Sequence, residues 1–132
     1  MLMFTFQKRE RLCHRKTIQL LFTHEVSKFF VYPLKVAYTK IDLQQAFPIQ
    51  VLLVVSKRYH PHAAKRNYIK RMMREAYRKN KHILIEVLQA HHSQIALMIN
   101  YTEHDILSYK KIEGKIILTL QRLCELYEKN SR

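Results

Sequence analysis

The side chains best placed to do chemistry are cations, and they are concentrated in one segment. Residues 57–82 contain ten Lys and Arg against Glu75 alone, so this fifth of the chain carries +9 of the formal net charge of +14. At 100° per residue, residues 62–79 form a helix with an apolar arc and an opposite cationic arc. The apolar arc holds Tyr68, Ile69, Met72, Met73 and Ala76, and the cationic arc holds Arg66, Asn67, Lys70, Arg71, Arg74 and Arg78. Cations this crowded repel one another, so the pattern predicts a polyanionic partner.

The cationic arc has three interpretations: a solvated face, a membrane-surface helix and a nucleic-acid-binding face. A solvated face would leave the repulsion uncompensated. A membrane helix would carry Trp, Phe or Leu where this one has Met72, Met73 and Ala76. Nucleic acid is therefore favoured. A DNA-reading helix normally sits in an all-helical domain, whereas this chain has strong strand signals, so structured RNA fits better and binding should depend on salt.

No other set of side chains predicts a catalytic centre or a metal site. The closest pairs among the eight histidines are His60/His62 and His91/His92, and neither has a carboxylate or cysteine at metal-ligand spacing. The single glycine excludes the glycine-rich phosphate loops of nucleotide-binding enzymes. We therefore expect no catalytic residue, no metal ligand and no small-molecule cofactor.

The elements that must position the basic helix follow from hydrophobic periodicity. Residues 16–23 place Ile18, Leu21 and Phe22 on one face of a short helix. Within residues 28–41, alternation from Leu34 to Thr39 predicts a half-buried strand that starts at Pro33. The run IQVLLVV (49–55) is apolar on both faces and predicts a central strand covered on each side.

Two further elements complete the expected order. The run QIALMIN (94–100) predicts a strand, and HILIEVLQAHH before it is compatible with a helix that continues past Asn80. Residues 104–128 predict a closing amphipathic helix. Its apolar stripe consists of Ile106, Tyr109, Ile112, Ile116, Leu120, Leu123 and Tyr127. Helices and strands in this order indicate an α+β fold.

Length and composition predict one soluble, basic domain spanning residues 1–132, and the cationic arc makes it an RNA-binding domain. The chain is 48% hydrophobic, enough to build a core and to exclude general disorder. No apolar run approaches the roughly 20 residues of a membrane span, and no secretory signal is visible, so we expect a cytoplasmic protein without a membrane partner. Cys13 and Cys124 are too far apart for a zinc pair and too few for a disulfide framework, so both are expected to be reduced, with Cys124 in the core.

The segment around the basic helix, SKRYHPHAAKRNYIKRMMREAYRKNKHIL, resembles the signature of the bacterial ribonuclease P protein subunit. That signature is Arg-Asn-Arg, an apolar residue, Lys-Arg, two apolar residues, then Arg-Glu-Ala-aromatic-Arg. The residues that match in register are Arg66, Asn67, Lys70, Arg71, Arg74, Glu75, Ala76, Tyr77 and Arg78. The resemblance extends over most of the chain, through TFQKRERL, IQLLF, LKVAYTK, VLLVVSKR and QIALMIN. Tyr68 departs from it, because the family usually has an arginine there.

The resemblance implies both a fold and a function. The fold is a four-stranded sheet with packed helices in the order α-β-β-β-α-β-α, a two-layer sandwich with a left-handed β-α-β crossover, although topology statistics alone favour the right hand. The function is that of an accessory subunit to a catalytic RNA, which removes the 5′ leader from precursor tRNA. Mg²⁺ ions held mainly by the RNA would supply the hydrolytic chemistry. The implied partners are the catalytic RNA subunit and precursor tRNA.

The resemblance also implies two binding surfaces. The first would neutralise phosphates of the catalytic RNA through Lys57, Arg58, Arg66, Asn67, Lys70, Arg71, Arg74 and Arg78. The second is a cleft between the first helix and the sheet that would hold the unpaired leader, with Ile18, Phe22 and Tyr38 as the matching positions. From the residues alone, Phe22 could equally be core. The alternative function is a ribosomal or ribosome-assembly RNA-binding protein without a processing role.

Overall fold

The structure, a computed structural model, describes residues 6–43, 45 and 47–130. Its elements are a 3-10 helix η2 (Lys8–Glu10), α1 (Arg15–Leu21), β1 (Ser27–Val31), β2 (Leu34–Lys40), β3 (Ile49–Val55), α2 (Ala63–Asn80), α3 (His82–Ala90), β4 (Ile95–Tyr101) and α4 (Tyr109–Asn130). The class is the predicted α+β. The order differs from the prediction in two places, because η2 precedes α1 and the chain turns at Lys81, which separates α2 from α3.

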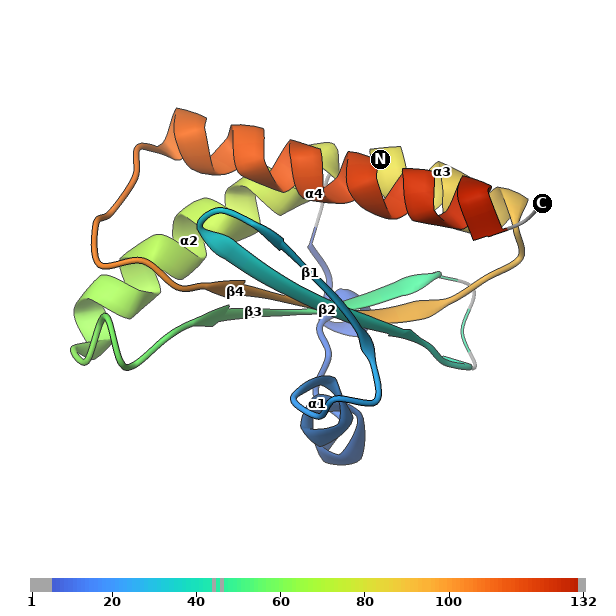
Figure 1. Ribbon diagram of the computed structural model, residues 1–132, viewed down its shortest axis with the longest axis horizontal. Coiled ribbons are helices and arrows are strands. Elements are labelled where there is room, and N and C mark those ends of the chain that lie inside the picture. The colour runs from blue at the N-terminus through green and yellow to red at the C-terminus, as the bar shows by residue number, and fades with distance from the viewer. Residues whose placement is uncertain (1–5, 44, 46, 131–132) are drawn as a thin grey trace.

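The four strands form one mixed sheet in the order β1-β2-β4-β3. β1 pairs antiparallel with β2, and β2 pairs antiparallel with β4, whereas β3 and β4 run parallel. The helices α2, α3 and α4 cover one face of the sheet, and α1 lies alone on the other (Figure 1). The predicted two-layer sandwich is therefore present, and α1 adds a partial third layer.

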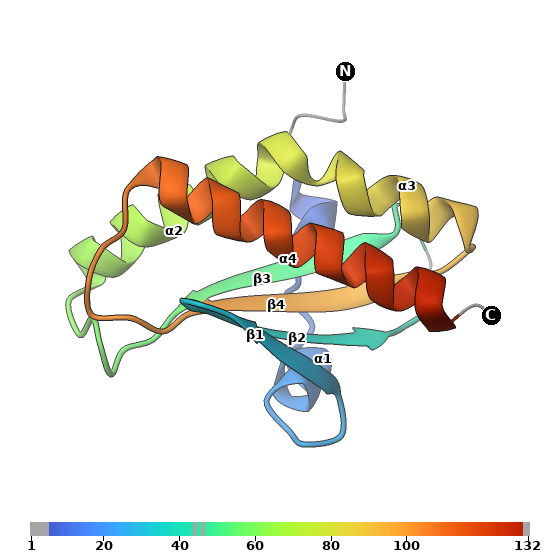
Figure 2. The same ribbon diagram turned by 45° about the horizontal axis from the view of Figure 1, so that its top comes forward.

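The connection from β3 to β4 passes through α2 and α3 and has the hand that the family resemblance implies. Parallel strands need such a long crossover, and most crossovers are right-handed. Viewed from the helix side with β3 and β4 pointing upward, β4 lies to the left of β3, so this crossover is left-handed (Figure 2). The basic helix α2 is part of this crossover.

β3 is an edge strand, so its predicted central position is wrong. The central, doubly covered strand is β4, six of whose seven residues are buried. β3 is apolar on both faces because the helix layer covers Ile49, Val51 and Val55, while Leu52 and Val54 pack toward α1. Beyond its edge the N-terminal segment makes a short contact, in which the Leu12 amide donates to the Val51 carbonyl oxygen at 2.9 Å and the Gln50 side-chain amide donates to the Arg9 carbonyl oxygen at 3.2 Å.

Two apolar clusters hold the layers together. The larger lies between the sheet and the three-helix layer and includes Ile69 and Met73 of α2. The smaller lies under the opposite face and joins Leu12 and Leu21 to Ala37, Ala96 and Met98. Because side chains alternate along a strand, neighbouring residues of β2 and β4 belong to different clusters. α2 and α1 are therefore held on opposite faces.

A buried ion pair ties the N-terminal segment to the junction of α2 and α3. The Lys81 ammonium donates to a Glu10 carboxylate oxygen, and their side chains are 0% and 2% exposed. The other Glu10 oxygen accepts from the Gln7 amide at 2.7 Å, and the Lys81 Nζ lies 5.5 Å from the centre of the Phe47 ring. Buried charges need such partners, so this pair fixes how residues 6–12 approach the sheet.

Three smaller expectations differ from the structure. Tyr68, placed on the apolar arc of α2, is 53% exposed, and the buried aromatic ring of that helix is Tyr77. Ile106 lies before α4 begins and is exposed, because residues 102–108 form a loop. Cys124 is half-buried beside the core, where burial raises the pKa of its thiol to about 11.

Among the residues described, no helix is long and apolar enough to span a membrane.

Candidate nucleic-acid interface

The centre of the cationic face of α2 is formed by three side chains without acidic partners. Lys70 is half-buried, and Arg71 and Arg74 are exposed. In the described part of the chain, no carboxylate lies within 4.0 Å of any of them. The opposite side of the helix is anchored by Ile69, Met73 and other buried residues. The packing therefore holds three uncompensated charges outward, an arrangement suited to contacts with phosphates.

The two ends of the predicted face are different, because their arginines have partners within the protein. The Arg66 Nη1 donates to the carbonyl oxygens of His60 and Pro61, at 3.0 and 2.6 Å, and so secures the entry of α2. Arg78 makes a bidentate contact with Glu75, at 3.0 Å from Nε and 2.6 Å from Nη2. This contact lowers the pKa of the Glu75 carboxyl. Arg66 and Arg78 thus carry positive charge and also hold parts of the protein in place through these contacts.

The remaining residues of the predicted face are all exposed: Lys57, Arg58 and Asn67. Lys57 and Arg58 lie in the turn after β3, where the Arg58 guanidinium stands 5.8 Å from the centre of the Tyr59 ring. Within the described residues the Asn67 side chain has no hydrogen-bond partner, so its amide is open to a ligand. Tyr68, exposed beside it, presents a ring where the family usually has an arginine.

One cation of this surface was missed by the sequence analysis. Arg11, from the segment that crosses the edge of β3, lines a small groove with Lys70 and Arg74 of α2. Its guanidinium lies over the Phe6 ring at 5.4 Å and has no carboxylate partner among the described residues. No sequence pattern groups Arg11 with Lys70, because the two residues are distant in sequence and only the fold brings them together. Three unpaired cations around one groove extend the cationic surface beyond α2.

A second surface is a cleft of about 570 Å³ between α1 and the sheet. Phe22, at the C-terminal end of α1, is 56% exposed and lines this cleft, so it is not a core residue. Phe30 of β1, 52% exposed, lines it too, together with Lys28, Lys35 and Asn100. The cleft therefore combines aromatic rings with cations, the combination that binds unpaired nucleic-acid strands.

The structure does not bring Ile18, Phe22 and Tyr38 together, and the predicted place of Tyr38 is wrong. Ile18 packs beneath α1 in the smaller apolar cluster, beside the cleft. Tyr38 faces the helix layer, where its ring meets that of Phe29 at 6.2 Å. Alternation along β2 puts Lys35 and Ala37, not Tyr38, on the side of α1. Lys28 and Phe30 of β1 were missed, because the face that α1 covers is set by tertiary packing.

The described residues hold no group of three or more His, Cys, Asp or Glu side chains placed to bind a metal ion.

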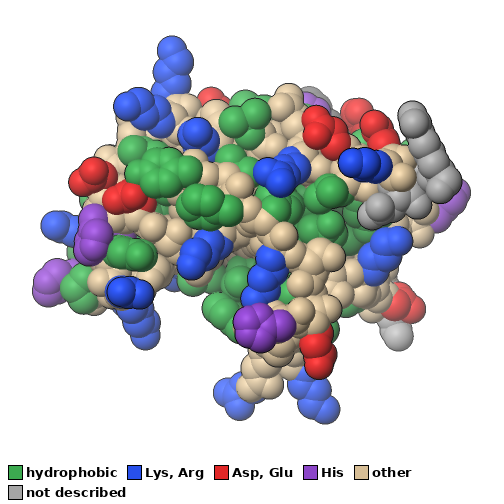
Figure 3. All heavy atoms as spheres, viewed as in Figure 1, with side chains coloured by type: hydrophobic (Ala, Val, Ile, Leu, Met, Phe, Trp, Pro, Cys, Tyr) green, Lys and Arg blue, Asp and Glu red, His purple; other side chains and the backbone are tan. Residues whose placement is uncertain are grey.

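Positively charged side chains are widespread on the surface. In Figure 3, Lys and Arg side chains project from the helix layer and from the layer that contains α1. Fold and surface together define a small, strongly basic α+β protein built on a mixed four-stranded sheet.

Comparisons with known proteins show which family this chain belongs to. The Ribonuclease P family model matches residues 6–123. The ribonuclease P protein component of Porphyromonas gingivalis (strain ATCC 33277) is 34% identical over 120 residues, which cover 91% of this chain and 87% of the relative. That of Chlorobium phaeobacteroides is 38% identical over 104 residues, 71% of this chain and 70% of the relative. The chain belongs to the ribonuclease P protein family, protein components of a tRNA-processing ribonucleoprotein nuclease.

Solved structures show the same fold. The ribonuclease P protein of Thermotoga maritima superimposes with a TM-score of 0.66 at 20% identity, covering 86% of this chain and 96% of that protein. The Staphylococcus aureus protein also gives a TM-score of 0.66, at 13% identity, with 89% and 97% covered. The architecture is thus common to proteins whose sequences differ at most positions.

Proposed function

We propose that this chain binds a catalytic RNA through the cationic face of α2 and so supports removal of the 5′ leader from precursor tRNA. The observation that carries the proposal is the trio Lys70, Arg71 and Arg74, which is held outward without acidic partners on a helix anchored in the core. Family membership supports the RNA partner. Lys57, Arg58, Asn67 and the groove at Arg11 extend the contact, and Arg66 and Arg78 contribute mainly by fixing the helix and its charge.

The cleft between α1 and the sheet is the proposed site for the unpaired 5′ leader. Phe22 and Phe30 offer ring faces on which bases can stack, and Lys28 and Lys35 lie close enough to the same cleft to neutralise phosphates. Ile18 supports the cleft from the apolar cluster below. This arrangement binds any base sequence, because every base has a flat face and every nucleotide a phosphate.

In this proposal the protein positions the RNAs, and the RNA carries out the hydrolysis. The Mg²⁺ ions are assigned mainly to the RNA subunit, and no protein side chain takes part in bond cleavage. The relatives from Porphyromonas gingivalis and Chlorobium phaeobacteroides are protein components of ribonuclease P. This supports a role as accessory subunit of an endoribonuclease, acting in the cytoplasm as a single domain.

The test is reconstitution with a bacterial ribonuclease P RNA at a Mg²⁺ concentration too low for the RNA alone to cleave. The wild-type chain should restore release of the leader from precursor tRNA. Changing Lys70, Arg71 and Arg74 together to Gln should abolish this rescue. The charge-matched control changes Lys110, Lys111 and Lys129, exposed cations of α4, to Gln and should retain it. Failure of the wild-type chain to restore cleavage would favour the ribosomal alternative.

A further inference from the structure

The outer edge of β1 is open to pairing with another strand. β1 ends the sheet on the side opposite β3, the strand over which α2 packs (Figure 2). In the described part of the chain, the only strand beside β1 is β2. On such an edge, alternate residues direct their amide and carbonyl groups outward. β1 therefore offers a backbone template on the side of the molecule away from the basic helix.

A groove of about 560 Å³ runs between this edge and α4. Val31, at the end of β1, lines it together with Leu118 and Leu126 of α4. Leu118 is exposed, and so are Phe30 and Tyr32 at the same end of the edge, where their rings meet at 6.4 Å. Exposed apolar side chains gathered beside an unpaired strand edge are typical of a contact surface for another protein.

Arg122 carries an available positive charge in this groove. Its guanidinium lies 4.9 Å from the centre of the Phe29 ring. No carboxylate of the described residues lies within 4.0 Å of it. Glu125 and Lys129 also line the groove, and their formal charges offset each other. The cation–π contact orients the guanidinium without neutralising it, so Arg122 can pair with an acidic side chain.

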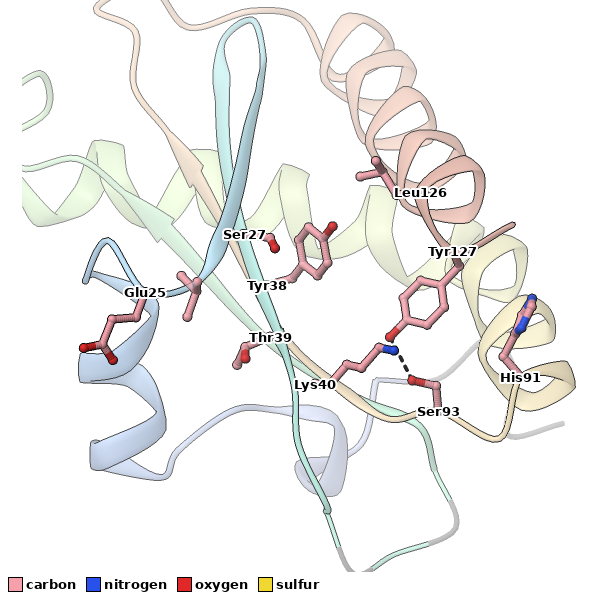
Figure 4. Close-up of a pocket in the computed structure, with 10 residues that line it drawn as sticks. Glu25, Ser27, Tyr38, Thr39, Lys40, His91, Ser93, Leu126 and Tyr127 are labelled. Carbon is pink, nitrogen blue, oxygen red and sulfur yellow. Dashed lines mark hydrogen bonds between the residues drawn. The ribbon is translucent and has the colours of Figure 1, made fainter. Parts of the chain in front are cut away.

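A cavity of about 400 Å³ follows the groove at the start of β1, and Leu126 lines both. Ser27 of β1 and Lys40 of β2 belong to this cavity (Figure 4). The Lys40 Nζ lies 5.4 Å from the centre of the Tyr127 ring, and no carboxylate of the described residues lies within 4.0 Å of it. Glu25 lines the cavity, but its carboxylate points away from Lys40 (Figure 4). The edge therefore has a second available cation.

The side chains of α4 in the groove have a spacing that a paired strand can match. Arg122 lies over Phe29, and Leu118 and Leu126 are four residues to either side of it on α4. Residues four apart on a helix are separated by about 6 Å, and side chains on one face of a strand repeat about every 6.8 Å. The matching strand therefore has apolar, acidic and apolar side chains at alternate positions.

We propose that the outer edge of β1 binds an extended acidic segment of a partner protein. The segment adds one strand to the sheet and places an acidic side chain on Arg122, between apolar side chains over Leu118 and Leu126. A second copy of the chain is disfavoured, because each copy carries +14 and has Lys28 on this strand. An RNA strand could pair with Arg122, but it lacks the row of amide and carbonyl groups that matches a strand edge. The inference is independent of the proposed function.

The test is an NMR titration of the full chain, without RNA, with the acetylated and amidated peptide Asp-Thr-Ile-Thr-Asp-Thr-Leu-Thr-Asp. Binding should shift the amide signals of Val31, Leu118 and Leu126. A peptide with Asn as its central residue should bind about ten-fold more weakly, the effect of one charge-assisted hydrogen bond. Of two peptides N-methylated on the two alternate sets of amides, one should lose binding and the other keep it, because a strand directs only every second amide toward its neighbour.

Variants of α4 test the groove itself. Arg122→Gln should weaken the Asp peptide about ten-fold and abolish its advantage over the Asn peptide. Leu118→Ala should weaken both peptides, because an apolar contact is lost. Lys111→Gln, the same loss of charge elsewhere on α4, should leave both affinities unchanged. All three positions are exposed and none lines the leader cleft, so the melting temperature should stay at the wild-type value.

Four results would overturn the proposal. The first is equal affinity of the wild-type chain for the Asp and Asn peptides, and the second is identical binding by the two methylated peptides. The third is a dimer in sedimentation equilibrium that the peptide dissociates, because a second copy would then occupy the edge. The fourth is pentauridylate that shifts the same α4 amides and is weakened about ten-fold by Arg122→Gln, which would assign the groove to RNA.

Discussion

The basic residues of α2 share a helix face but differ in what their charged groups contact. Lys70, Arg71 and Arg74 lack acidic partners among the described residues, whereas Arg66 donates to two backbone carbonyl oxygens before α2. Helical periodicity places all four on one arc, so the sequence predicts the same RNA-binding role for each of them. The structure of the preceding turn shows that Arg66 also fixes the backbone.

We expect single Ala substitutions of Lys70, Arg71 and Arg74 to reduce the salt dependence of binding to the catalytic RNA. Each lost phosphate contact should lower the slope of log K against log salt concentration by about 0.7–0.9. Arg66→Ala should instead lower the free energy of unfolding by about 1–2 kcal/mol, because charged hydrogen bonds to carbonyls are lost. Filter binding at several salt concentrations and urea unfolding measure the two effects. Unchanged slopes in all three variants would rule out this face.

A pH effect is expected where the β1–β2 hairpin meets the loop after β4. The Tyr32 hydroxyl donates to Glu103 at 2.6 Å, which lowers the pKa of the Glu103 carboxyl and raises the pKa of Tyr32 to about 12. The folded state favours the Glu103 carboxylate, so this stabilisation is present above the ordinary pKa of Glu and is lost as pH falls through the lowered one. Tyr32→Phe should therefore raise the Glu103 pKa in a carbon-13 NMR titration. An unchanged value would show that the hydroxyl has no such effect.

For the helices and strands, the sequence predicts well which type of element each segment forms. It predicts poorly which elements lie next to one another in the fold. The strands ending at Val55 and Tyr101, the basic helix and the closing helix are all present, because their apolar periodicity reflects burial by any neighbour. The edge position of β3 and the face of Tyr38 were wrong. The edge position of β3 is set by the strand order, and the face of Tyr38 by which side of the sheet α1 covers. Both are determined by residues far apart in sequence. The cleft is therefore lined by Phe22, which the family resemblance placed there, and by Phe30, which the sequence did not indicate.

The cleft between α1 and the sheet gives a prediction at this scale. Phe22→Ala and Phe30→Ala should each weaken binding of leader-bearing precursor tRNA by about 1–3 kcal/mol, the loss expected for one stacked base, and leave mature tRNA unaffected. Both rings are more than half exposed, so the melting temperature should change little. Leu118→Ala, an exposed apolar residue of α4, is the matched control. Equal losses for both RNAs would exclude leader binding in this cleft.

The buried Glu10–Lys81 pair makes the N-terminal segment part of the fold. Lys81→Met leaves a carboxylate buried without its partner and should cost about 3–5 kcal/mol of unfolding free energy, measured in urea. The double variant Glu10→Met/Lys81→Met should recover part of that loss, because no unpaired charge remains. Lys79→Met, an exposed neighbour at the end of α2, should change stability by less than about 0.5 kcal/mol. A small effect of Lys81→Met would mean that the segment is held by apolar contacts alone.

For the whole molecule, the net charge of +14 exceeds what its own carboxylates can compensate. The acidic residues number ten against 24 Lys and Arg, and one of the ion pairs they form, Glu10 with Lys81, is buried. Repulsion among cations is therefore the dominant long-range electrostatic contribution to the free energy of the isolated chain. A partner with many phosphates would relieve it, and so would salt, which screens charge without occupying a specific site.

We therefore expect the isolated protein to become more stable as salt increases. The screening length falls from roughly 30 Å at 0.01 M to about 8 Å at 0.15 M, which weakens repulsion between exposed cations while leaving the buried Glu10–Lys81 pair largely unaffected. The melting temperature should rise over this range of NaCl. Changing Lys70, Arg71 and Arg74 to Gln lowers the formal charge from +14 to +11 and should reduce that rise. A melting temperature that falls with salt would show that attractive pairs outweigh the repulsion, and the cationic face would then need no polyanion to stabilise it.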